Sequence, residues 1–104
     1  MSDLTYWADT FGESYAPTLV FELSNGLLGL AWQTLEKKMA GVVYTEFILA
    51  TIVEPGGHIQ HYTTYSVPKT LVKRVEPYKW RRESVLSDLF GRAKGILLER
   101  GEKE

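Results

Sequence analysis

The pattern of apolar and polar side chains predicts a sheet followed by a helix. The longest apolar run covers 42–54, where β-branched and aromatic residues fill both alternating faces. We therefore expect a central strand there, covered on both sides. Shorter β-like runs at 18–24, 58–67 and 70–76 are bounded by turn-forming Gly, Asn and Pro residues. Together these runs predict an antiparallel sheet of three to five strands over 18–76.

Two segments outside the sheet have helical spacing. Residues 78–100 place apolar side chains on one face and charged ones on the other, after a proline and before a glycine. We predict a long amphipathic C-terminal helix there, followed by a frayed tail at 101–104. Residues 1–16 are expected to form a short helical entry segment, with Trp7 and Phe11 on its apolar face.

The segment 25–40 admits two interpretations. The pair Asn25-Gly26 between apolar runs is a hairpin signal, which would make 27–35 a second strand. The same residues also place a stripe of apolar side chains at helical spacing, with plausible caps at both ends. The agreement between spacing and caps favours a second helix over 25–40. The predicted fold class is therefore α+β.

The composition agrees with a single domain over 1–104. The chain has 104 residues, of which 44% are hydrophobic and 24% charged, as in ordinary folded domains. It contains no cysteine, which fits a reducing compartment such as the cytosol. No apolar run approaches the ~20 residues that a membrane helix needs, and the N-terminus lacks the pattern of a secretory signal. We predict a cytoplasmic protein without membrane contact.

Basic residues gather in one short segment, 69–82, although the whole chain has a net charge of −1. This segment holds six basic residues and one acidic residue, whereas 1–68 holds two basic and seven acidic residues. Cations attract phosphates and aromatic rings stack on unpaired bases, so the segment could contact nucleic acid. The whole chain, however, lacks the net positive charge that is usual in nucleic-acid-binding proteins. This favours an acidic protein surface over nucleic acid as the partner of the segment. The candidate residues for either partner are Lys73, Arg74, Lys79, Trp80, Arg81 and Arg82.

The only histidines are His58 and His61. Their spacing suggests a metal site, but residues three apart on a strand face opposite sides, and further ligands are not evident. We therefore predict no metal and no cofactor. A ligand pocket on the 58–67 strand stays open as an interpretation, with His61, Tyr62 and Tyr65 as its candidate residues.

The sequence has no familiar catalytic motif, which makes an enzyme the less favoured interpretation. Our main hypothesis is a non-enzymatic binding or assembly module that self-associates and contacts another protein. It rests on the two-faced strand at 42–54, which needs cover from a helix at 25–40 or from a second copy of the chain. We therefore expect a homo-oligomer. The alternatives are nucleic-acid binding through 69–82 and a small-ligand or enzymatic role at 58–67.

Overall fold

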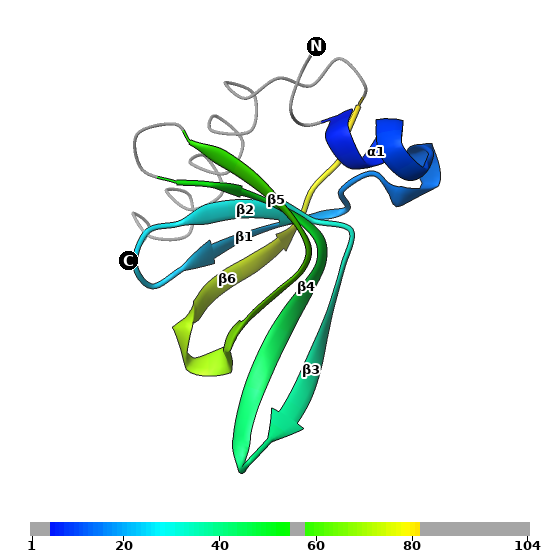
Figure 1. Cartoon of the computed structure of the whole chain (residues 1–104). Coiled ribbons are helices and arrows are strands. Elements are labelled where there is room, and N and C mark those ends of the chain that lie inside the picture. Colours follow the sequence, from blue (N-terminus) through cyan, green and yellow to red (C-terminus); the bar gives the residue numbers. More distant parts are fainter. Residues whose placement is uncertain (1–4, 55–57, 82–104) are drawn as a thin grey trace.

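The computed structural model describes residues 5–54 and 58–81, which form a curled antiparallel sheet (Figure 1). Strands account for 59% of the described residues. One short helix, α1, precedes the sheet, and two 3₁₀ turns, η2 and η3, lie in its connections. The elements are α1 (Tyr6–Phe11), η2 (Glu13–Tyr15), β1 (Leu19–Leu23), β2 (Leu28–Ala31), β3 (Gln33–Met39), β4 (Val42–Val53), β5 (Ile59–Pro68), η3 (Lys69–Leu71) and β6 (Val72–Pro77).

The long strand β4 organises the sheet. Along one edge, its first half pairs with β3 and its last residues pair with β2, while β5 pairs along its other edge. The order β3-β4-β2-β1-β6 continues from there, and every pair is antiparallel. The sheet curls into a half-barrel, from which the β3–β4 hairpin projects away from α1 (Figure 1).

The predicted helix at 25–40 is wrong, because the hairpin signal at Asn25-Gly26 prevails. Gly26 has a φ of 93°, and the Asn25 Oδ1 accepts a hydrogen bond of 3.1 Å from the Leu27 backbone N–H. These features make a tight turn between β1 and β2, which then continues as β3. The apolar residues that suggested a helical stripe are divided between two strands.

The α+β fold class is therefore corrected to a mostly β fold. The described residues contain no long C-terminal amphipathic helix. The expected helix at 78–100 does not begin at 78, because 78–81 have no regular secondary structure. The rest of that predicted helix and the tail at 101–104 lie outside the described residues. The expected N-terminal helix is confirmed as α1, over six residues.

A bend at Leu49 changes which residues of β4 face the interior. Leu49 has a φ of 51°, in the left-handed region that side chains with a Cβ rarely adopt. Before the bend Phe47 joins the concave core, and after it Ala50 and Ile52 do. The inward positions thus change from odd to even numbers at this residue, while the pairing register with β5 is the same on both sides of it. The simple alternation expected along 42–54 fails at this point.

The sheet has an apolar cluster on each face. The concave cluster fills the half-barrel, and the Phe21 and Phe47 rings stack in it with centroids 3.8 Å apart. Its buried members are Phe21, Leu23, Ala31, Phe47, Ala50, Ile52 and Val67. The convex cluster lies over β1, β2 and the end of β4. Its buried members are Val20, Leu30, Val53 and Tyr78.

The expectation that both faces of the central strand are covered holds only for its second half. Residues 49–53 are buried, whereas Val42 is 44% exposed and Ile48 is half-buried. The cover of the second half includes α1, where the Trp7 indole N–H donates a hydrogen bond of 3.2 Å to the Ala50 carbonyl. Neither a helix at 25–40 nor a second copy of the chain is needed there.

The β3–β4 hairpin has a two-residue turn, whose geometry leads to a stability prediction. Met39 pairs with Val42 across Ala40 and Gly41, which have φ values of 51° and 81°. Positive φ at both positions defines a type I′ turn, for which Asn-Gly is the preferred sequence. Ala40→Asn should therefore raise the free energy of unfolding by about 0.5–1 kcal/mol. Urea denaturation will measure it, and Ala40→Val should shift the midpoint the opposite way.

Candidate functional site

The basic segment lies along the outer strand β6 and the residues that follow it. Lys73 and Arg74 belong to β6, while Lys79 and Arg81 come after its end and Arg82 lies outside the described residues. The Lys73 Nζ is 3.9 Å from a carboxylate oxygen of Glu22 on β1. Part of the positive charge of β6 is therefore balanced within the sheet.

The two aromatic residues of the basic segment pack inward. Tyr78 is 7% exposed within the convex cluster, and Trp80 packs against the same cluster and is half-buried. A ring that stacks on an unpaired base must present its face to solvent. Within the described part of the segment, the cations of β6 therefore lie beside aromatic rings that pack into the convex cluster.

The residues of the expected ligand pocket are divided between the two faces of the sheet. His61 lies on the convex side, where its Nδ1 is 3.0 Å from the Thr51 hydroxyl and its ring stacks on Tyr6 at a centroid distance of 4.1 Å. Tyr62 and Tyr65 pack against the concave cluster, with ring centroids 5.0 Å apart. The bend at Leu49 changes which residues of β4 face the interior, and the residues of β5 that pair with them change face at the same point. Sequence spacing alone therefore grouped side chains that the fold separates.

Burial raises the pKa of the Tyr65 hydroxyl, and the neighbouring Tyr62 and Glu54 add to the shift. Below the ordinary value near 10, the phenol is protonated in both the folded and the unfolded chain. Above it, the unfolded chain loses this proton first, so the free energy of unfolding falls as the pH rises through the folded pKa. Tyr65→Phe should remove the part of this decrease in the free energy of unfolding that comes from ionisation of Tyr65. Urea midpoints of both proteins across the alkaline range will measure it, and parallel pH curves would contradict it.

Neither a group of metal ligands nor a membrane-crossing helix occurs among the described residues. Within 5–54 and 58–81, no three His, Asp or Glu side chains gather closely enough to hold a metal ion. The same residues include no helix with the length and apolar character for crossing a membrane.

A row of aromatic side chains links α1 to the convex face of the sheet. Its rings contact one another in sequence, from the His61–Tyr6 stack through Trp7 to Trp32, whose indole N–H donates a hydrogen bond of 2.9 Å to the Ser14 carbonyl. A hollow of about 400 Å³ lies at the far end of the row. It is lined by Phe11, Tyr15, Trp32, Ile48 and Leu49.

A second exposed apolar surface lies on the projecting hairpin. Leu35, Met39 and Val42 share the convex side of β3 and β4 and are 45%, 46% and 44% exposed. Every residue of β3 is exposed, and β3 pairs with β4 alone among the described strands. Its outer edge therefore has unpaired backbone N–H and C=O groups, which can accept another strand. We call this edge, with the three apolar side chains, the hairpin surface.

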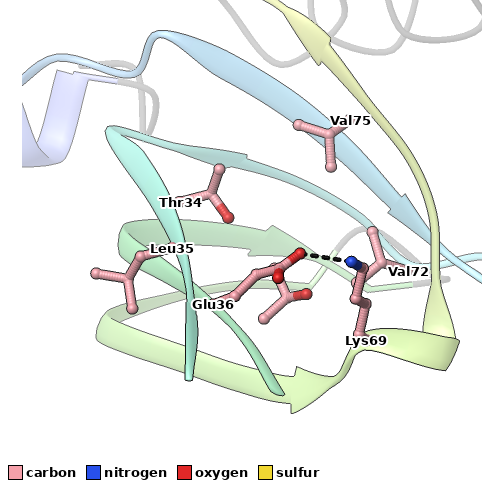
Figure 2. A pocket seen from close by; sticks show the side chains of 7 residues that line it. Thr34, Leu35, Glu36, Lys69, Val72 and Val75 are labelled. Atoms are coloured by element: carbon pink, nitrogen blue, oxygen red, sulfur yellow. Dashed lines mark ion pairs between the residues drawn. The ribbon is translucent and has the colours of Figure 1, made fainter. Parts of the chain in front are cut away.

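The concave side of the hairpin faces a small hollow of about 300 Å³ (Figure 2). Glu36 on β3 and Lys69 on η3 meet there, with a carboxylate oxygen 2.7 Å from the Nζ. Val72 and Val75 line the opposite side, while Leu35 points away from the ion pair (Figure 2). Both charged side chains are more than half exposed, so the pair adds little stability.

The hairpin surface was missed in the sequence because the segment 25–40 was interpreted as a helix. The available signal was Ala40-Gly41 between two runs of strand-compatible residues. No model of a known protein family matches this chain, and comparison with curated proteins and with solved structures finds no match.

Proposed function

We propose that the protein is a non-enzymatic binding module that self-associates and contacts another protein through the hairpin surface. The observation that supports this most directly is the free edge of β3 beside three large apolar side chains that are nearly half exposed. Isolated exposed apolar residues are common, but three on the same face of one hairpin, beside an unpaired strand edge, suit a docking surface.

The shape of the hairpin supports the same proposal. It projects from the half-barrel, so an approaching strand meets no other described element along the edge of β3 (Figure 1). Strand addition at such an edge gains affinity from main-chain hydrogen bonds and specificity from neighbouring side chains. Many proteins avoid such pairing by keeping their edge strands very short. β3, with seven residues, is longer than such protected edge strands.

The test is the molar mass of the protein in solution, measured by light scattering during size-exclusion chromatography. The wild-type mass should rise with concentration from the micromolar to the millimolar range. Leu35→Glu combined with Met39→Glu should abolish the rise, because it places charges in the apolar part of the contact. Leu71→Glu is the matched control, since Leu71 is as exposed as Leu35 but lies on η3. A monomeric mass at every concentration would contradict self-association.

A further inference from the structure

We propose that the partner of the hairpin surface is a second copy of this chain, paired β3 to β3 in the register that sets Lys37 opposite Lys37. This proposal rests on the proposed function and specifies its partner. A twofold axis at Lys37 relates the two chains, and their strands run antiparallel. The argument comes from the backbone of the edge, the charges along it and its apolar side chains.

The free backbone groups of β3 belong to alternate residues. In a two-residue hairpin the pair that flanks the loop, here Met39 and Val42, is a hydrogen-bonded pair. Pairs along the ladder alternate in type, so the odd-numbered residues of β3 bond to β4. The N–H and C=O groups of Thr34, Glu36 and Lys38 consequently point outward, where a second strand can bond to them.

The twofold axis restricts how two β3 strands can align. An axis perpendicular to the sheet keeps each side chain on its own face, so residues opposite each other must have the same facing. The alignments that overlap most of the strand are then centred on Leu35, on Glu36 or on Lys37. Each of the three makes different cross-strand pairs, and such pairs determine the stability of an antiparallel contact.

Charge distinguishes the three registers. The register centred on Lys37 sets Glu36 opposite Lys38 twice, once on each side of the axis. The register centred on Glu36 sets two carboxylates directly opposite each other, which is destabilising. The register centred on Leu35 sets Thr34 opposite Glu36 and Gln33 opposite Lys37, without an ion pair. Only the first gives opposite charges across the contact.

The apolar side chains favour the same register. Centring on Lys37 sets Leu35 opposite Met39 on the convex face, again twice. These two residues are otherwise nearly half exposed. The axis also sets the two Lys37 side chains directly opposite each other, which is destabilising, as for the carboxylates in the register centred on Glu36. Two ion pairs and two apolar pairs therefore oppose one repulsive contact.

The ion pair within the chain prepares Glu36 for this role. Lys69 holds the carboxylate on the concave side of β3, on the same face as Lys38. In the paired form, each Glu36 would lie between Lys69 of its own chain and Lys38 of the other. A carboxylate between two cations is more favourable than one beside a single cation at the edge.

Disulfide cross-linking between single introduced cysteines can identify the register, because the wild-type chain contains no cysteine of its own. Opposite residues of a non-hydrogen-bonded pair have Cα atoms about 4.5 Å apart, within the range that a disulfide bridges. Lys37→Cys should therefore form a covalent dimer under mild oxidation. Glu36→Cys and Leu35→Cys are matched controls, which should not cross-link in the proposed register. Each control would cross-link only if the strands paired in the register centred on that residue. Cross-linking of a control in place of Lys37→Cys would overturn the proposal.

Charge exchange tests the pairing without a covalent bond. Glu36→Lys alone places four cations at positions 36 and 38 of the contact and Lys38→Glu alone places four carboxylates there, so each variant should be monomeric. An equimolar mixture should form a heterodimer, because both pairs between positions 36 and 38 then carry opposite charges. Leu71→Lys is the control, since it adds an exposed cation on η3, outside the β3 contact, and should leave the wild-type mass of a dimer.

The outcomes separate this inference from the proposed function. A concentration-dependent dimer that persists in Glu36→Lys, with no cross-link through Lys37→Cys, would overturn the register while self-association stands. A wild-type chain that is monomeric at millimolar concentration, with no cross-link through any of the three cysteines, would overturn both. A cross-link through Lys37→Cys and recovery of the dimer in the mixture are the expected results.

Discussion

Gly29→Ala should lower the free energy of unfolding by about 1–3 kcal/mol, because no space exists for one more methyl group. A Cβ at Gly29 would lie 2.5 Å from Cζ of Phe21 and 3.0 Å from Cδ1 of Ile52. Phe21 is 1% exposed and stacked on Phe47, so its ring cannot move without disturbing the concave core. The residues paired with Gly29 on both neighbouring strands are the ones that occupy its space.

Urea denaturation of four proteins will measure this effect: the wild type, Gly29→Ala, Phe21→Leu and the double variant. Leucine lacks the ring atoms that approach position 29, so Gly29→Ala should cost less stability in the Phe21→Leu background. The difference is the coupling between the two positions. Equal costs in both backgrounds would contradict the assignment of the clash to the Phe21 ring.

Trp7→Ala should have a still larger effect, on the order of 3–5 kcal/mol, because it removes the main anchor of α1. Trp7 is 5% exposed, lies edge-on to the His61 ring and donates its indole N–H to the Ala50 carbonyl. A helix of six residues is far too short to be stable alone. Its loss would expose the convex side of β4 around Leu49 and Thr51.

Trp7→Phe separates the contribution of packing from that of the hydrogen bond. Phenylalanine keeps most of the apolar contact but leaves the Ala50 carbonyl without its donor, which should cost about 1–2 kcal/mol. Thermal unfolding followed by circular dichroism will rank the wild type, Trp7→Phe and Trp7→Ala in that order. Similar midpoints for all three proteins would mean that α1 does not stabilise the sheet.

The strands and the N-terminal helix could be predicted because their signals were local. Runs of β-branched and aromatic residues at 18–24, 42–54, 58–67 and 70–76 correspond to β1, β4, β5 and β6. Each run ends at residues that break regular structure, so its pattern admitted one main interpretation. The expected three to five strands become six, because the segment 25–40 contributes β2 and β3.

The segment 25–40 could not be assigned because its apolar residues fit both the spacing of a strand and the spacing of a helix. Leu27 and Ala31 face the concave cluster while Leu28 and Leu30 face the convex one, so apolar residues occur on both faces of β2. Such a run also makes a stripe at helical spacing. Besides the turn at Asn25-Gly26, the close packing of Phe21 over Gly29 favours the sheet, and this contact between strands is contained in no local pattern.

The faces on which the side chains of 58–67 lie could not be predicted for a related reason. Positive φ at Leu49 has no signature in the sequence, since the left-handed region is unusual for leucine. Simple alternation along the 58–67 strand would place His61 and Tyr65 on one face. The predicted self-association rested on cover for both faces of 42–54, and this argument fails for 49–53, which the chain buries itself. The proposal made above depends instead on the hairpin surface.

Because of the bend at Leu49, the length of the first half of β4 can change without altering how its second half packs. Residues 50–53 keep their facing through contacts with β2, with α1 and with residues 59–62 of β5, which pair with β4 beyond the bend. Adding or removing one residue on each side of the Ala40-Gly41 turn would lengthen or shorten the projecting arm while the interior kept its arrangement. New side-chain combinations on the arm would thus carry little risk to folding, a property that suits the docking role proposed for the hairpin surface.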